Sequence, residues 1–335
     1  MTTKQTMHLG KGGPLVFPMA LGCMGMGRGS WYGVSDEPES IATIHEAIER
    51  GVNVLDTGDF YGMGKNEMLV GRAIQDRRDK VLLSVKYGAL RGPDGAFLGH
   101  DCRPAATKNA LAHSLSRLGV DHIDIYRPAR LDPEVPIEDT IGAIAELVQA
   151  GYVRYIGLSE VGAETLRRAA RVHPICDLQI EYAIVTRNPE GAIIPALREL
   201  GIAMTAYGVL SRGLLTGAKP IGKGDGRAHM PRFAEENAQK NAPLVETLSR
   251  LAADKGVTPA QLAIAWVRTK SAVQGVGIVP TMGARTRKQL LEALSGLDVT
   301  LTDAEVSALE TSVPASEVAG SRYPAAAMAT LDSER

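Results

Sequence analysis

The chain has 335 residues, of which 44% are hydrophobic and 22% charged, and its formal net charge is -1. This composition is typical of a globular protein with a sizeable core, built either as one large α/β barrel or as two ordinary domains. The near-zero charge provides no basic field, so we expect no nucleic-acid partner. No apolar window is long enough to cross a membrane, and residues 1–16 lack the apolar core of a signal peptide.

The cysteine content also bears on location. The three cysteines, Cys23, Cys102 and Cys176, are widely spaced and form no CxxC pair. An odd number of cysteines without metal-ligand spacing predicts free thiols in a reducing compartment and no metal site. We therefore expect a cytoplasmic protein without a membrane partner. The sequence leaves open whether the chain forms a homo-oligomer.

Short apolar runs alternate with segments of helical periodicity along most of the chain. The expected strands are 19–24, 52–55, 81–85, 123–126, 152–158, 178–180, 202–207 and 275–279. The expected helices are 41–50, 66–74, 104–118, 137–148, 163–172, 189–200, 237–255, 259–269 and one from about residue 286. The other expected segments are a lead-in over 1–17, a polar loop over 88–103, a glycine-rich mobile segment over 208–236 and a loosely packed tail over 314–335.

Eight strands, nearly all followed by a helix, predict parallel strands joined by crossover helices. Eight such units in one chain favour a closed (β/α)8 TIM barrel, with residues 1–335 as a single domain whose core is 15–313. An open doubly wound sheet would place a GxGxxG turn directly after the first strand. The run Gly22-Cys23-Met24-Gly25-Met26-Gly27 lacks that spacing, and no helical pattern begins there.

Three residues carry the chemistry that the sequence suggests. Asp56 ends the second strand, Tyr61 follows it in a loop, and Lys86 ends the third strand. In a parallel barrel these strand ends lie together at the catalytic face. A buried ion pair of Asp56 and Lys86 is the structural alternative. With the tyrosine added, we expect the ammonium to lower the phenol pKa, so that Tyr61 can protonate a carbonyl oxygen as hydride reaches its carbon.

The sequence also resembles a known family. The matching stretches include Leu55–Gly62, Asn66-Glu67, Gly119–Tyr126, Gly151–Ser159 and Leu210–Gly217. Over roughly residues 15–313 the chain resembles the aldo-keto reductase superfamily, (β/α)8 barrels that use NADPH. The similarity is closest to the microbial and plant branch with perakine-reductase-like and pyridoxal-reductase-like enzymes.

The resemblance implies a catalytic role for each of the three residues. Tyr61 would donate the proton, Lys86 would lower its pKa, and Asp56 would hold Lys86. The family's fourth catalytic residue is a histidine after the fourth strand, and Ala129 stands in its place. Loss of one hydrogen-bond donor of this kind costs about 10²–10³ in rate. Either Arg127 or a bound water supplies a substitute, which makes Arg127 a candidate substrate-binding residue, or the enzyme is slow or has left catalysis. A salt bridge at the barrel rim is the alternative role for both Arg127 and Arg130.

The resemblance implies an NADPH site around the same rim. Ser159 and Gln179 match contacts to the nicotinamide carboxamide, Tyr207 matches the residue that stacks on the nicotinamide, and 208–216 match the loop over the pyrophosphate. The full set of candidate cofactor-binding residues is Gly22, Met24, Asp56, Ser159, Gln179, Tyr207, Gly208, Leu210, Arg212, Gly213, Arg285 and Gln289. Core packing is the alternative role for Tyr207.

A cluster of cations follows the last strand. Arg285, Arg287 and Lys288 begin a helix, where positive charge is unfavourable unless an anion binds. A solvated surface is the alternative, but (β/α)8 barrels commonly bind phosphate after their last strands. By resemblance Arg285 would contact the 2′-phosphate and Gln289 the adenine side, which favours NADPH over NADH.

Aromatic residues are scarce, at 4% of the chain, and two of them lie in the loop after the first strand. Trp31 and Tyr32, with Phe60 and Tyr61 after the second strand, are expected to face the substrate, although Trp31 would equally suit a lid packed on its own loop. The sequence as a whole predicts an NADPH-dependent enzyme that reversibly reduces an aldehyde or ketone. A catalytically weak NADPH-binding sensor is the alternative, because Ala129 replaces the histidine.

Overall fold

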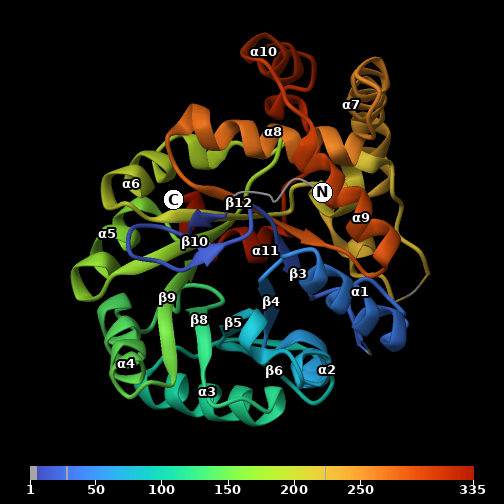
Figure 1. The fold of residues 1–335 in the computed structure, drawn as a ribbon. Helices are drawn as coiled ribbons and strands as arrows, with labels where there is room; N and C mark the ends of the chain where they lie inside the picture. The colour runs from blue at the N-terminus through green and yellow to red at the C-terminus, as the bar shows by residue number, and fades with distance from the viewer. Residues whose placement is uncertain (1–5, 28, 223) are drawn as a thin grey trace.

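The computed structural model describes residues 6–27, 29–222 and 224–335, so the first five residues of the expected lead-in lie outside it. Eight parallel strands close into a barrel in the order β3-β4-β5-β8-β9-β10-β11-β12, with β12 pairing back to β3 (Figure 1). Their bounds are Ala20–Gly22, Val54–Gly58, Leu82–Tyr87, Ile123–Pro128, Val153–Ser159, Ile175–Glu181, Ala203–Tyr207 and Ile278–Gly283. The predicted (β/α)8 barrel is confirmed.

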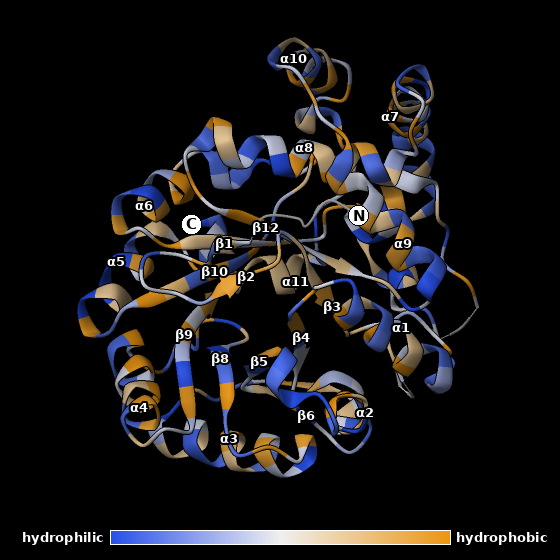
Figure 2. Ribbon diagram, in the orientation of Figure 1, coloured by the Kyte–Doolittle hydropathy of each residue, from blue (hydrophilic) through white to orange (hydrophobic). Residues whose placement is uncertain are grey.

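Helices form an outer ring around the strands. Their bounds are α1 Glu37–Glu49, α2 Lys65–Ile74, α3 Pro104–Leu118, α4 Ile137–Gln149, α5 Ala163–Val172, α6 Ile193–Leu200, α7 Glu235–Asp254, α8 Pro259–Gln274, α9 Arg287–Ser295 and α10 Asp303–Ser312. Hydrophilic and hydrophobic residues alternate along these helices (Figure 2), as expected when one face packs on the strands. Local capping supports the ends: Thr258 and Gln261 form a capping box at the start of α8.

An N-terminal hairpin, which the sequence analysis did not predict, contributes to a separate apolar cluster. Its strands are β1 (Met7–His8) and β2 (Leu15–Val16). Leu9 and Val16 are fully buried there against inward-facing residues of the barrel strands, including Val54 and Ile125. The strands are only two residues long, so no alternating pattern could reveal them.

Two further segments differ from the sequence expectation. The loop expected over 88–103 contains a second hairpin, β6 (Ala89–Arg91) and β7 (Phe97–His100). The segment 208–236, expected to be mobile, forms short 3-10 turns at 211–216, 226–229 and 231–233. Its charged residues Asp225, Arg227 and Arg232 are buried and hydrogen-bonded, and this pairing holds the segment in place despite its glycines.

The expectation of a loosely packed C-terminal tail is wrong. Residues 314–335 include the short helix α11 (Ala325–Met328), which lies within the outline of the ring of strands in Figure 1. The Asp332 carboxylate accepts a hydrogen bond from the Gly162 backbone N–H at 2.7 Å, and Arg322 is only 5% exposed. The segment is rich in alanine, and its few polar residues form no local pattern that predicts these contacts. In the part of the chain that the structure describes, no helix is long and apolar enough to span a membrane.

Candidate active site

The barrel strands direct alternate residues inward, and in their C-terminal halves many of these are polar. In β4 and β5, the pairs Val54/Asp56 and Leu82/Ser84 share one face, because strand side chains repeat every two residues. Val54 and Leu82, the first residues of the two pairs, pack in the apolar cluster to which the N-terminal hairpin contributes. Asp56 and Ser84, two residues further along each strand, join a polar network. The barrel interior therefore has an apolar layer at the start of these strands and a polar layer at their ends.

Asp56 is the centre of this network. Its carboxylate pairs with the Lys86 ammonium at 2.5 Å and accepts hydrogen bonds from Ser84 at 2.9 Å and Gln179 at 2.8 Å. Asp56 and Lys86 are 5% and 3% exposed, so neither charge is shared with solvent. The predicted pairing of Asp56 with Lys86 is present in the structure. Gln179, expected at the nicotinamide, instead donates its side-chain N–H to Asp56.

Tyr61 begins the 3-10 turn Tyr61–Gly64 directly after β4, and the Lys86 Nζ lies 5.2 Å from the centre of its ring. The expected lowering of its pKa is not found. Burial, followed by the negative charge of Asp56, raises the pKa of Tyr61 well above its ordinary value, and Arg130 acts in the opposite direction. Burial and the Asp56 charge thus favour the protonated form of the phenol at neutral pH. A retained proton is what a proton donor needs.

Arg127 does not occupy the place expected for a substrate-binding residue. Its side chain is completely buried inside the barrel, where it pairs with Asp177 at 2.9 Å and donates to Ser84 at 3.0 Å. Inward orientation follows from its strand position, since Arg127 pairs in register with Lys86. This geometry argues against direct substrate contact, and the role that remains for Arg127 is to support the polar layer beneath Asp56.

Arg130, two residues beyond the end of β8, is the cation that reaches the mouth of the barrel. Its Nη1 donates to the Ala129 carbonyl at 2.6 Å and to the Ser159 hydroxyl at 3.3 Å. Its Nη2 donates to the Tyr323 hydroxyl at 3.2 Å. The Ser159 hydroxyl is therefore an acceptor for Arg130 in this structure.

A second buried network joins the C-terminal segment to this rim. The Glu160 carboxylate accepts hydrogen bonds from Arg322 at 2.9 and 3.0 Å, from Ser333 at 2.6 Å and from Tyr207 at 2.6 Å. Burial by itself would raise the pKa of Glu160, but hydrogen bonding and attraction by Arg322, with help from Arg130, lower it to about 2. Glu160 is thus a fixed anion.

Sequence reasoning assigned no role to Glu160, Arg322 or Tyr323. The Arg322-Tyr323 pair could have been noticed in the sequence, because few other residues of the C-terminal segment can pair with a buried acid. Its partner could not be read from the sequence, since Glu160 and Arg322 are 162 residues apart.

Several residues expected to bind the cofactor, including those of the expected pyrophosphate loop over 208–216, lie on two rim loops. Gly22 ends β3 and Met24 follows it, while Gly208, Leu210, Arg212 and Gly213 follow β11. Ser211 and Arg212 have left-handed backbone conformations, with φ of 46° and 57°, which are uncommon for residues other than glycine. The Arg212 guanidinium donates to Glu181 at 3.4 Å and lies 4.6 Å from the centre of the Tyr323 ring.

Arg285 and Gln289 lie at the start of α9, as the sequence predicts. Arg285 Nη1 donates to the Tyr32 carbonyl at 3.2 Å, and the Gln289 side chain accepts from the Arg285 backbone N–H at 2.9 Å. Arg287 is paired with Glu39 at 2.9 Å. Arg285 and Lys288 form no ion pair with a described carboxylate. Their positive charges can therefore pair with a bound anion.

Trp31 and Tyr32 belong to the loop after β3, and the structure favours the lid alternative for Trp31. Its carbonyl accepts a hydrogen bond from the Gly226 N–H at 2.8 Å, and its ring lies so close to Gly226 that a Cβ there would be 2.2 Å from it. The Tyr32 ring meets the Trp31 ring edge-on at 4.9 Å. The loop after β3 and the segment after β11 are therefore pinned together.

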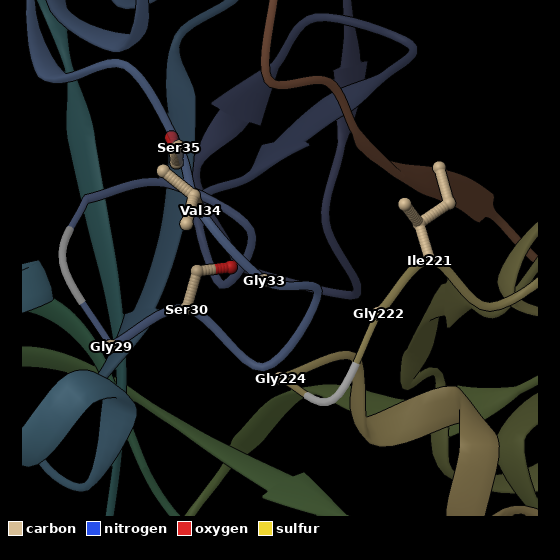
Figure 3. Close-up of a pocket in the computed structure, with 8 residues that line it drawn as sticks. All are labelled: Gly29, Ser30, Gly33, Val34, Ser35, Ile221, Gly222 and Gly224. Carbon is tan, nitrogen blue, oxygen red and sulfur yellow. The ribbon is translucent and has the colours of Figure 1, made fainter.

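A pocket of about 550 Å³ opens between these two segments, and most of its lining is glycine and serine. Figure 3 shows Ser30, Val34 and Ser35 on one side and Ile221 on the other. Asp56, Tyr61 and Lys86 do not line it. Small side chains leave backbone groups accessible, which suits a ligand that is recognised through main-chain N–H groups.

The site thus combines an inward Asp56–Lys86 pair, a tyrosine at the barrel rim and a cationic helix start. Residues 18–313 match the model of the Aldo/keto reductase family. The chain belongs to this family. Membership makes it an oxidoreductase of a family that generally carries out NADP-dependent carbonyl reduction.

Two curated members of the family are similar over nearly their whole length. The chain is 38% identical over 326 residues to a probable aldo-keto reductase 1 from Glycine max, covering 95% of this chain and 92% of that protein. It is also 38% identical over 322 residues to the aldo-keto reductase yakc [NADP(+)] from Schizosaccharomyces pombe, covering 93% of each.

Solved structures of family members share the fold. A glycerol dehydrogenase from Gluconobacter oxydans superposes with a TM-score of 0.80 at 26% identity, covering 93% of this chain and 96% of the other. An aldo-keto reductase from Bacillus halodurans in its holo form gives a TM-score of 0.75 at 27% identity, covering 93% and 97%.

Proposed function

We propose that this aldo-keto reductase binds NADPH and reduces the carbonyl group of an aldehyde or ketone, with Tyr61 as the proton donor. The observation that carries the proposal is the arrangement of Tyr61 above the buried Asp56–Lys86 pair, with the Lys86 Nζ 5.2 Å from the ring centre. A phenol that holds its proton next to a cation can protonate an oxygen on which negative charge develops.

The residues present fit NADPH as the cofactor. Arg285 and Lys288 stand at a helix start without carboxylate partners among the described residues, and positive charge there suits the extra phosphate that distinguishes NADPH from NADH. Arg212 and the glycines after β11 would hold the pyrophosphate, and Tyr207 would lie against the nicotinamide. When bound, the cofactor supplies hydride to the carbonyl carbon.

The protein's own groups have separate tasks in this reaction. Tyr61 gives its proton to the carbonyl oxygen and recovers one from solvent afterwards. Lys86 stabilises the phenolate left behind, and Asp56 keeps Lys86 in position through its 2.5 Å contact. Ser84 and Gln179 hold the other Asp56 oxygen, so the carboxylate has little freedom to turn away. The substrate is a small-molecule carbonyl compound, and the space left by Ala129 favours one that is bulkier or more polar than a simple aldehyde.

The test follows NADPH oxidation with a panel of aldehydes, dicarbonyls and bulky cyclic ketones, for the wild type and Tyr61→Phe. We expect the wild type to turn over at least one compound and Tyr61→Phe to lose about 10²–10³ or more in kcat, because the proton donor is gone. Tyr155→Phe, a tyrosine on β9 outside the site, is the matched control. Tight NADPH binding with no turnover by the wild type would overturn the proposal in favour of a sensor.

A further inference from the structure

The position of the absent histidine is flanked by polar groups from the ends of β8 and β9 and from the C-terminal segment. Ala129 is 2% exposed and its side chain can donate nothing. The adjacent Arg130 folds back, so that its Nη1 lies 2.6 Å from the Ala129 carbonyl and 3.3 Å from the Ser159 hydroxyl at the end of β9. The guanidinium therefore lies across the ends of β8 and β9, beside the residue that lacks a donor.

Arg130 keeps part of its hydrogen-bonding capacity. A guanidinium has five N–H donors, and the three hydrogen bonds to Ala129, Ser159 and Tyr323 occupy three of them. The other two donors, on Nε and Nη2, make no hydrogen bond to any residue that the structure describes. No described carboxylate lies within ion-pair distance of Arg130 either, and Glu160 acts on its charge only from farther away.

A directed chain of hydroxyl groups holds the guanidinium in place. Tyr207 donates its only hydroxyl proton to Glu160 at 2.6 Å. Its oxygen must therefore accept the 2.8 Å hydrogen bond from Tyr323, and the Tyr323 oxygen in turn accepts from Arg130. Each hydroxyl polarises the next toward the buried Glu160 carboxylate. The Tyr323 hydroxyl is thus held by Tyr207, which is itself hydrogen-bonded to Glu160, and it accepts a hydrogen bond from Arg130.

Tyr61 is electrostatically close to this cation. Tyr61 follows β4, Lys86 lies in β5 and Arg130 follows β8, and these are three consecutive strands of the barrel. Arg130 lowers the pKa of the Tyr61 phenol, against the effects of burial and Asp56, and Tyr61 in turn acts on Arg130. Arg130 and Tyr61 therefore lie on neighbouring loops at the same end of the barrel. A carbonyl oxygen that receives the Tyr61 proton would be within the field of Arg130.

We propose that Arg130 donates a hydrogen bond to the substrate's carbonyl oxygen in place of the histidine, with Tyr323 as its positioning residue. This inference rests on the proposed function. The carbonyl carbon gains a hydride and the oxygen gains the Tyr61 proton, while Arg130 keeps all its protons and only stabilises the charge that develops on oxygen. The C-terminal segment thereby becomes part of the catalytic machinery.

Two other residues compete for this role. Arg127 is fully buried, and its guanidinium is used by Asp177, Ser84 and Thr205. His100, in β7, has its pKa lowered to about 4, first by burial and then by Arg130, so it is neutral at pH 7. A neutral histidine can still donate, and His100→Phe therefore belongs in the experiment.

The experiment measures kcat and KM with the best substrate of the panel, together with the Kd for NADPH and the melting temperature. We expect Arg130→Gln to lower kcat about 10²–10³-fold, as removal of an oxyanion donor does, with the NADPH Kd changed less than about threefold. Arg168→Gln, an arginine on the outer helix α5 that pairs with Glu138, is the matched control and keeps wild-type kcat. His100→Phe should also keep it.

Two double variants separate a positioning role from a structural one. Tyr323→Phe should lower kcat about tenfold in the wild type and change nothing further in Arg130→Gln, because it acts through Arg130. Adding Ala129→His to Arg130→Gln should restore at least about tenfold of the lost kcat.

The inference is overturned if Arg130→Gln keeps kcat within about threefold, or if His100→Phe shows the larger loss. Arg130→Lys is a further control. If Arg130→Gln and Arg130→Lys weaken NADPH binding and lower the melting temperature to the same extent, the inference is overturned in favour of a structural role for Arg130. If the wild type is active and Tyr61→Phe is not, such a result leaves the proposed function standing. Absence of wild-type turnover overturns both.

Discussion

Single buried charges decide much of the chemistry around the barrel mouth. Asp56 is paired with Lys86, and Glu160 is paired with Arg322, so each of these buried groups has a partner of opposite charge. Asp59 is different. One of its carboxylate oxygens is buried with no described hydrogen-bond partner, and the other accepts only a long 3.4 Å hydrogen bond from the Gly88 N–H. Its ionised form is poorly supported.

Asp59→Asn should change how stability depends on pH. Burial, followed by repulsion from Glu67, raises the pKa of Asp59 from 3.8 to about 7 in the folded protein. Between about pH 4 and 7 the folded state therefore holds a proton that the unfolded chain has lost, and stability falls as pH rises through this window. Relative to Asp59→Asn, the wild type should lose about 1–3 kcal/mol of unfolding free energy between pH 5 and pH 8.

Urea titrations at both pH values would measure this effect. Asp79→Asn is the matched control, because Asp79 is exposed and should leave the pH dependence as in the wild type. A wild type and an Asp59→Asn variant with parallel pH profiles would show that Asp59 ionises normally in the folded protein.

At the scale of elements, the C-terminal segment is held by a few polar contacts to strand ends. Arg322 pairs with Glu160 at 2.9 Å and with Glu334 at 2.6 Å, and it approaches Glu181 at 3.6 Å. The short α11 contributes no fully buried side chain. Stability of this segment therefore depends on the ion pairs more than on apolar packing.

Arg322→Leu should destabilise the protein strongly. Removing one partner leaves the Glu160 carboxylate buried without its cation, which costs about 3–5 kcal/mol in comparable buried pairs. In a Glu160→Gln background the same substitution should cost about half of that or less, since the Glu160 charge that Arg322 neutralises is already absent. Arg171→Leu, at an exposed position of α5, is the control and should cost about 0.5 kcal/mol or less. Equal losses in both backgrounds, measured by urea denaturation, would contradict the pairing.

For the whole molecule, the proposed NADPH contacts come from strands and loops spread around the barrel. Residues after β3, β9, β11 and β12 all contribute candidates, so a bound cofactor would connect elements that are far apart in sequence. Ligand binding to the folded state alone stabilises it by mass action.

NADPH should therefore raise the melting temperature of the whole barrel. At a concentration of about 100 times Kd the expected stabilisation is about 2.7 kcal/mol, with less from NADH at the same concentration. Arg285→Ala should weaken NADPH binding about tenfold or more and leave NADH binding nearly unchanged, because only NADPH has the extra phosphate. Arg287→Ala is the matched control, since Glu39 already pairs with that arginine. An equal response of Arg285→Ala to both cofactors would count against the phosphate contact.

Regular periodicity made most of the fold predictable. The eight barrel strands and the helices α1 to α9 follow patterns that extend over several residues, and the predicted bounds differ from the observed ones by only a few residues in most cases. The hairpins β1–β2 and β6–β7 and the helix α10 were missed. Two-residue strands are too short to show alternation, and the exposed β6–β7 hairpin lacks the buried face that would impose it.

The sequence by itself determined the barrel, the family and the placement of Asp56, Tyr61 and Lys86 at one rim, because local patterns and strand order are written along the chain. Only the tertiary structure decided where each charge finds its partner. It buried Arg127 against Asp177, raised the pKa of Tyr61, and brought Arg322 and Tyr323 to a strand end more than a hundred residues away. Burial and long-range pairing depend on three-dimensional proximity, which no local pattern specifies.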